Sequence, residues 1–373
     1  MKRISGLLMI LLLSFNACST DDSGEGSGEK ETDSFDRGAM LTHWADNIIV
    51  PSFEAFQASS QSLENATEAY VNDPSAGTLS ALKQQYRDSY LQFQTVSMFE
   101  IGKAEQLGYR RYLNTYPTNT SAIESKIESG SYNLELPSSF AEQGFPAMDY
   151  LLYGLGSSEE TIQAFTAGEN AETYRAYLLD VAKRINSLTA EVTTAWQGDF
   201  RDQFVENTSS SATGSVDRFS NDYVMYFEKF LRSGKIGYPA GAFTGSPSPE
   251  NAEAVYAGDL SKELYIKAFE AFQDFYFGRN FNSSGNGPSY KQYLEYLDSM
   301  KDGADLSVLI EDRFQAIESQ SEQLDDNFKS QVQNNNTTML AAFDELQKAV
   351  VLLKVDMMQA LSISVDYVDS DGD

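Results

Sequence analysis

Apolar residues recur every three or four positions along most of this chain, which places them on one face of successive helices. The first such stretch runs through Ile48, Val50, Phe53, Phe56 and Leu63. Pro51 predicts a kink or a short break near its start. The same spacing covers residues 74–108, 159–196, 216–235, 261–278, 303–328 and 339–363. The alternation typical of strands is nearly absent, so the pattern predicts an all-α fold.

Glycine and proline mark the breaks in this pattern. Residues 114–143 are polar and broken by both, which predicts loops with short helices. Residues 233–250, "SGKIGYPAGAFTGSPSPE", are too rich in both to form a regular helix and are predicted to join two halves. We therefore expect two packed antiparallel helical bundles, at residues 35–235 and 236–373. A faint similarity between aromatic helices of the two halves suggests an internal duplication.

The beginning of the chain has the pattern of a secretory signal. Two basic residues precede an apolar run, residues 7–13, which is too short to span a bilayer. Cys18 follows, and it resembles the lipidated cysteine of bacterial lipoproteins; the alternative is an ordinary signal peptide with an incidental cysteine. We expect residues 1–17 to be a signal peptide and residues 18–34, which are rich in Ser, Gly and acids, to be a flexible tether.

These features predict a protein of the cell envelope that is attached to a membrane through a lipid on Cys18. The acidic run after this residue is similar to signals that send lipoproteins to the outer membrane, where the protein would face the periplasm or the cell surface. Cys18 is the only cysteine, so an intramolecular disulfide and a structural cysteine-ligated metal site are both excluded.

Charge narrows the choice of partners. The chain has 55 acidic and 27 basic residues, a formal net charge of −28. Such a surface repels phosphate backbones, so nucleic acid is excluded as a partner. It suits a metal cation or a small ligand that carries one, although a solvated acidic surface explains the charge equally well. The sequence identifies no protein partner.

One stretch, "GFPAMDYLLYG" at residues 144–154, sets a single acid among apolar residues. If Pro146 is the first helical residue, Asp149 lies in the first turn, where the helix dipole favours an acid by roughly 0.3–1 kcal/mol. However, Phe145 and Leu152 share its face of the helix. A carboxylate buried there needs a partner, which could be Arg, Tyr, a backbone N–H or a metal. We expect Asp149 to lie in a cleft between the bundles.

The same stretch is similar to the Gly-x-His-x-x-Glu segment of the imelysin-like proteins. Further blocks that resemble this family in order are "ADNIIVPSFEAF" at 45–56, "FEIGKAE" at 99–105, "SGKIGYPAGAFTG" at 233–245, "SPENAEAVYAGDLSKEL" at 248–264 and "LKVDMMQALSISVDYVDSDGD" at 353–373. The resemblance implies a secreted or lipid-anchored protein of two helical bundles, with the motif near their junction. It also implies a link to iron uptake and a classification among peptidases.

Carried over by position, the motif glycine is Gly144, the histidine falls on Pro146 and the glutamate on Asp149. Proline has no side-chain donor or acceptor, so a metal bound as in the family needs other ligands. His43 is the only histidine, and zinc hydrolases use two or three. An all-oxygen site could hold iron or another divalent or trivalent cation. The other candidates for a ligand or polar site are Glu100, Tyr153, Asp222 and Asp356; the alternative for each acid is a structural pair with Arg or Tyr.

Three functions remain open at this point. The first is a non-catalytic, extracytoplasmic binding component in the acquisition of iron or another ligand. The second is a metal-dependent peptidase with altered ligands. The third is a surface interaction protein whose aromatic-rich groove, in a chain with 12% aromatic residues, binds a partner.

Overall fold

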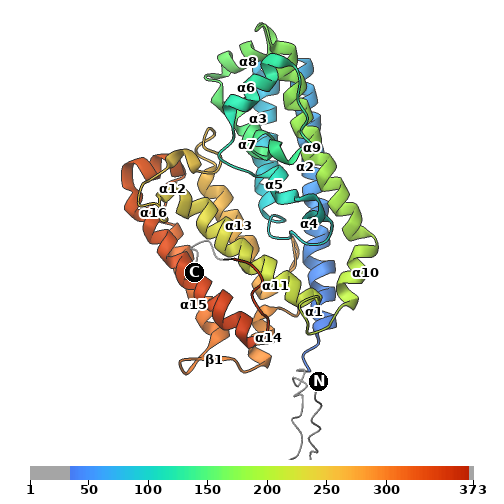
Figure 1. Cartoon of the computed structure of the whole chain (residues 1–373), viewed down its shortest axis with the longest axis vertical. Helices are drawn as coiled ribbons and strands as arrows, with labels where there is room; N and C mark the ends of the chain where they lie inside the picture. The colour runs from blue at the N-terminus through green and yellow to red at the C-terminus, as the bar shows by residue number, and fades with distance from the viewer. Residues whose placement is uncertain (1–33, 369–373) are drawn as a thin grey trace, which may run out of the picture. The chain divides into compact units, whose positions relative to one another are not determined.

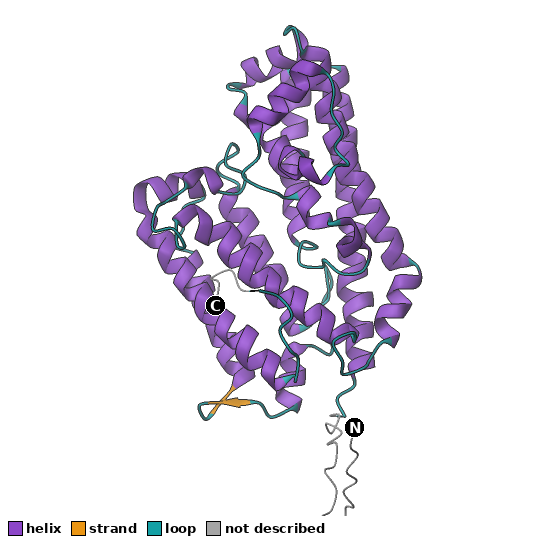
Figure 2. Ribbon diagram, in the orientation of Figure 1, coloured by secondary structure: helices purple, strands orange, loops and turns teal. Residues whose placement is uncertain are grey.

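Helices make up nearly all the regular structure of the computed structural model, which describes residues 34–368 (Figure 2). Within this range the strands form one hairpin, in which Met300 pairs with Asp305 and Lys301 with Ala304. The predicted all-α fold is therefore confirmed. The predicted signal peptide, the tether and Cys18 lie outside the described residues.

The elements follow the order labelled in Figure 1. Up to the motif they are α1 (Arg37–Trp44), η1 (Ala45–Ile49), α2 (Val50–Asn72), α3 (Ala76–Gln94), α4 (Lys103–Leu107), α5 (Tyr109–Leu113), α6 (Thr120–Ser129), η2 (Pro137–Glu142) and α7 (Gly144–Asp149). The middle of the chain forms η3 (Tyr150–Gly154), α8 (Ser158–Thr166), α9 (Ala171–Gln197), α10 (Asp199–Glu206), α11 (Ser215–Met225), η4 (Tyr226–Gly237), α12 (Tyr238–Ala240) and η5 (Pro249–Asn251). The last elements are α13 (Ser261–Phe277), α14 (Tyr290–Tyr296), β1 (Met300–Lys301), β2 (Ala304–Asp305), α15 (Leu306–Ser321), α16 (Phe328–Val350), η6 (Val351–Met357) and α17 (Met358–Ala360).

The long helix α2 packs against both α3 and α9, and the three run side by side (Figure 1). The apolar stripe predicted for α2 forms this contact, since Phe53, Phe56 and Leu63 are fully buried. Ser75 begins α3 with a capping box, in which its side chain and that of Thr78 satisfy two backbone N–H groups. Sequence periodicity and capping thus account for this part of the fold.

In the later part of the chain, α16 packs against η4 and α15, while α13 packs against both η4 and α3. The chain from Phe35 onward forms one unit, and the predicted division after residue 235 stays a prediction. The local prediction for residues 233–240 is wrong, because they continue as helix through η4 and α12. The break falls instead at Gly241, whose φ of 72° ends α12, and a Cβ there would lie 2.2 Å from the Ser246 carbonyl oxygen.

Four segments of the described chain, η1, η3, η4 and η6, are wound as π-helix. A π-helical turn widens the backbone and is enriched at functional sites. Two of them bear directly on the site below: η3 follows Asp149 without a break, and η4 carries Lys229 and Lys235.

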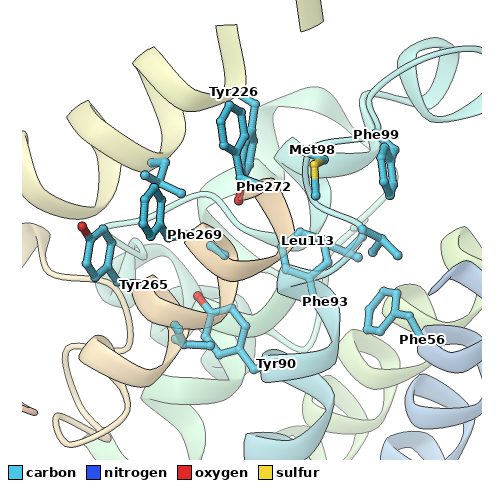
Figure 3. Packing of buried hydrophobic residues seen from close by; sticks show 14 of the residues in the cluster. Phe56, Tyr90, Phe93, Met98, Phe99, Leu113, Tyr226, Tyr265, Phe269 and Phe272 are labelled. Carbon is cyan, nitrogen blue, oxygen red and sulfur yellow. The ribbon is translucent and has the colours of Figure 1, made fainter. Parts of the chain in front are cut away.

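The core is rich in aromatic rings, several of which are shown in Figure 3. Phe145 of the motif stacks on Tyr90 of α3 with ring centroids 4.4 Å apart and an interplanar angle of 4°. A second stacked pair, Tyr223 and Phe272, joins α11 to α13 with centroids 3.9 Å apart. Such contacts each add about 0.5–1.5 kcal/mol to the burial of the rings, so they fix the elements that carry the site. Within the described residues, no helix has the length and apolar character needed to cross a bilayer.

Candidate functional site

Asp149 is the last residue of α7, and only 1% of its surface is exposed. Its Oδ2 accepts a hydrogen bond from the backbone N–H of Tyr256, and its Oδ1 accepts one from Ala257, both at 2.9 Å. Burial raises the pKa of Asp149 from 3.8 to about 7, although the two N–H donors favour the charged form. The predicted first-turn position is wrong, since α7 begins at Gly144 and Asp149 lies beyond its first turn.

Gly144 begins α7 with φ of 72°, a conformation that residues with a side chain rarely adopt. A Cβ at this position would lie 2.2 Å from the Leu113 carbonyl oxygen and 2.6 Å from that of Tyr112. The motif glycine therefore allows α7 to begin directly against the end of α5. Pro146, at the position of the family's histidine, is buried two residues further on.

Two tyrosines lie close to Asp149. The Tyr86 hydroxyl is buried and makes no hydrogen bond of ordinary geometry, and burial followed by the charge of Asp149 raises the pKa of this tyrosine well above 10. Tyr153, on η3, packs against Tyr86 with ring centroids 5.9 Å apart, and the Lys83 ammonium lies 4.4 Å from the centre of the Tyr153 ring. Tyr153 thus shares the surroundings of Asp149 but forms no printed hydrogen bond to it.

The turn bonded by Asp149 also presents Glu253 to a buried polar network. The Glu253 carboxylate forms an ion pair with Lys235 of η4, and both side chains are at most 3% exposed. Glu253 Oε1 also accepts from Asn114 Nδ2 at 2.7 Å and lies 3.0 Å from the Tyr90 hydroxyl. Lys235 donates a second hydrogen bond to Gln94 Oε1 at 2.9 Å. Burial lowers the pKa of Lys235, and the Glu253 carboxylate opposes this change.

A cavity of about 480 Å³ opens beside this network. Lys235, Gln94 and Asn114 form part of its wall, so the network and the cavity share residues. The remaining wall comes from α5 and the residues just after it, from Phe140, and from η4 and Tyr238. Asp149 does not line this cavity. The carboxylate is buried as the cleft hypothesis requires, but it is enclosed and not open to a cleft.

Glu100 and Asp222 meet around one buried arginine that the sequence analysis did not single out. Arg110 pairs with Asp222 at 3.2 Å, and its own backbone N–H donates to Glu100 Oε2 at 2.9 Å. The Glu100 N–H in turn donates to Asp222 Oδ2 at 2.8 Å. Burial raises the pKa of Glu100 from 4.5 to about 7. Of the two alternatives considered for these acids, the geometry is that of a structural pairing with Arg.

His43 and Asp356 lie apart from this cluster. The His43 Nε2 hydrogen-bonds to the Gly278 carbonyl oxygen at 2.8 Å, and Nδ1 lies 3.3 Å from Asn47 Nδ2, so both ring nitrogens are engaged. Asp356 is not among buried apolar neighbours: its side chain is 20% exposed and forms an ion pair with Lys301 of the hairpin.

The family motif implies a metal, and the residues at the motif do not fit one. Pro146 offers no donor, and both oxygens of Asp149 already accept backbone hydrogen bonds. Across residues 34–368, no three His, Cys, Asp or Glu side chains are grouped so that they could share a metal ion. We therefore derive no chemistry from a metal at Asp149.

Sequence reasoning missed the charged residues at the centre of this region, Arg110, Lys235 and Glu253. Lys235 and Glu253 lie in two of the blocks that resemble the family, each flanked by small or apolar residues, which is a weak signal of a buried charge. Their pairing joins positions 18 residues apart across a loop, and no periodicity indicates it.

Residues 49–354 match the profile of the imelysin family, which covers most of the chain, so the protein belongs to this family. The resemblance found in the sequence is thereby confirmed. Iron-regulated protein A of Synechococcus elongatus is 24% identical over 174 residues, which cover 47% of this chain and 44% of that relative. The match therefore spans less than half the length of this relative.

Two solved structures share the fold. An imelysin-like protein from Psychrobacter arcticum superposes with a TM-score of 0.67, and a putative iron-regulated protein A precursor from Parabacteroides distasonis with a TM-score of 0.70. Each is 16% identical, and each likeness covers 89% of this chain and 97% of the other. At this identity the likeness concerns the fold alone.

Proposed function

We propose that this protein is a non-catalytic binding component of the cell envelope, anchored by a lipid on Cys18 and linked to the acquisition of iron or of a ligand that accompanies it. The family, together with a relative and a structural neighbour that are both named for iron regulation, supports the link to iron. The N-terminal pattern of a basic pair, a short apolar run and a lone cysteine supports the anchor and an outer-membrane location.

The hydrogen bonding of Asp149 is the observation that favours binding over catalysis. Both of its oxygens accept backbone N–H groups, so the carboxylate has a structural role and is not aimed at a substrate. Pro146 supplies neither a general base nor a metal ligand at the neighbouring motif position. What remains beside the motif is a cavity of about 480 Å³, within the usual size range of small-ligand sites.

The full-length protein, purified in detergent, provides the test. It should cleave none of a panel of unstructured peptides, with or without added metal. Its metal content, measured by elemental analysis, should be the same in wild type and in Asp149→Ala, because Asp149 is not a ligand. Asp356→Ala is the matched control, since it removes an acid from a partly exposed ion pair away from the motif.

Peptide cleavage that a chelator abolishes would instead support the metal-dependent peptidase, and loss of bound metal in Asp149→Ala alone would restore this residue as a ligand. A protein that shows no cleavage and binds neither metal nor small ligand would leave the surface interaction protein.

A further inference from the structure

The cavity beside the buried network has a charge opposite to that of the molecule. Four basic residues line it, and no Asp or Glu does: Arg110, Arg111, Lys229 and Lys235. The chain as a whole carries −28. A cavity lined by cations in so acidic a protein is not explained by composition.

Two of these four cations are balanced by acids that stand behind the wall. Arg110 pairs with Asp222, and Lys235 pairs with Glu253. The other two have no ion pair within the described part of the chain: Arg111 is exposed, and Lys229 is half-buried with its ammonium 5.3 Å from the centre of the Tyr367 ring. The cavity therefore retains an uncompensated positive charge, which attracts an anion.

Aromatic rings form much of the remaining wall. Phe230 and Tyr226 stack beneath the Arg110 guanidinium, which lies 4.4 Å and 5.2 Å from their ring centres. Phe140, Tyr116 and Tyr238 complete the aromatic part of the lining. Flat rings beside a guanidinium suit a planar apolar group whose charged end reaches the cations.

Gly234 keeps part of the cavity open. It lies on the wall within η4, and a Cβ there would be 3.2 Å from the Tyr116 hydroxyl. A larger side chain at this position would therefore occupy the cavity itself while leaving its charges in place.

From this geometry we propose that the cavity binds a small organic anion with a planar apolar part, of the aromatic carboxylate class, either free or as its ferric complex. The inference rests on the proposed function as a binding component and names its ligand class. The charged end lies near Arg111 and Lys229, and the planar part lies along Phe140, Tyr226 and Phe230. A bare cation is disfavoured by the same lining.

The test uses probes of one shape and different charge. Binding of 3-hydroxy-2-naphthoate to the full-length protein is measured by calorimetry, beside its ferric complex and the neutral analogue 3-hydroxymethyl-2-naphthol. The anion should bind at least tenfold more tightly than the neutral analogue. Gly234→Leu should abolish binding of both, because it fills the cavity.

Variants then locate the charge that is responsible. The double variant Arg111→Gln with Lys229→Gln should weaken binding of the naphthoate at least tenfold. The matched control, Lys183→Gln with Lys329→Gln, removes two charges that do not line the cavity and should change the affinity less than twofold. Circular dichroism of each variant establishes that the fold is retained.

The outcomes separate this inference from the function on which it rests. Equal binding of anion and neutral analogue, no binding of the naphthoate, or an unchanged affinity in the Arg111 and Lys229 double variant would each overturn the anion site. Stoichiometric binding of iron without any organic anion would also overturn it, while leaving the proposed binding component intact. Binding of the free anion but not of its ferric complex would support the anion site and contradict the link to iron.

Discussion

Asp149 shows how one side chain can hold together two distant parts of a chain. Its carboxylate satisfies consecutive N–H groups 107 and 108 residues further on, in the turn that precedes α13. Buried N–H groups left without an acceptor are costly, and hydrogen bonds to a charged group are stronger than neutral ones. The acid at this position is thus explained by the backbone it bonds.

Removal of this carboxylate should therefore destabilise the protein strongly. We expect Asp149→Ala to lower the free energy of unfolding by about 2–5 kcal/mol, because two buried N–H groups lose their acceptor and a small cavity forms. Urea denaturation followed by circular dichroism measures this. Asp356→Ala, which breaks a partly exposed ion pair, should cost about 1 kcal/mol or less. Equal losses in the two variants would contradict the role assigned to Asp149.

The same residue should make stability depend on pH. Its pKa rises from 3.8 to about 7 on folding, so the folded state keeps a proton that the unfolded state has lost between these values. The free energy of unfolding should then fall as the pH rises from about 4 to about 7. Glu100, with a pKa raised from 4.5 to about 7, adds a slope of the same sign. Denaturation at several pH values should show a shallower slope in Asp149→Asn, and a slope unchanged in this variant would refute the assignment.

Gly144 offers a test of close backbone packing with a built-in control. Gly144→Ala imposes both a positive φ and a Cβ that meets the Leu113 carbonyl oxygen at 2.2 Å. Gly130→Ala imposes a similar φ of 64° at a position where no atom lies within 4 Å of the new Cβ. We expect Gly130→Ala to cost about 1 kcal/mol and Gly144→Ala several times more, measured as the midpoint of urea denaturation. Similar midpoints would show that strain alone, and not the contact with α5, sets the requirement for glycine.

At the scale of elements, the buried ion pair joins η4 to the turn before α13. Replacing one partner leaves the other charge buried and alone, so Lys235→Met should lower the free energy of unfolding by about 3–5 kcal/mol. The double variant Lys235→Met with Glu253→Gln should recover part of this loss, because the uncompensated carboxylate is gone. Urea denaturation of the two variants measures the difference, and additive losses would contradict the pairing.

The helices were predictable from sequence because each depends on local periodicity. The stripe of Phe53, Phe56 and Leu63 is legible in the sequence and is buried in the structure. The course of η4 was not, since π-helical winding carries the chain through Gly234 and Gly237, which sequence rules treat as breaks. The position of the break at Gly241 depends on contacts with Ser246 that only the folded chain reveals.

The site was less predictable for a related reason. Asp149 was identified by its apolar neighbours and its place in the family motif, but its partners are backbone groups, which have no sequence signature. Arg110 was missed because it sits in a short polar helix between loops. Glu100 and Asp222 were selected as ligand candidates, and the cation that pairs them is the arginine and not a metal.

At the scale of the whole molecule, the proposal for the N-terminus can be tested without reference to the fold. Cys18→Ser removes the only thiol of the chain. We expect the wild-type protein to incorporate labelled fatty acid and to sediment with membranes, and the variant to lose the label and become soluble after cell disruption. Retention in the membrane fraction without label would indicate that a segment other than a lipid holds the protein there.

The contrast between the acidic molecule and its basic cavity has a consequence for how an anion arrives. At a distance, the net charge of −28 repels it, and the attraction of Arg111 and Lys229 acts only close to the opening. Dissolved salt screens the long-range repulsion beyond about 10 Å at 0.1 M ionic strength and weakens contacts inside an enclosed site much less. Moderate salinity should thus quicken capture of an anion, the reverse of the usual behaviour of oppositely charged partners.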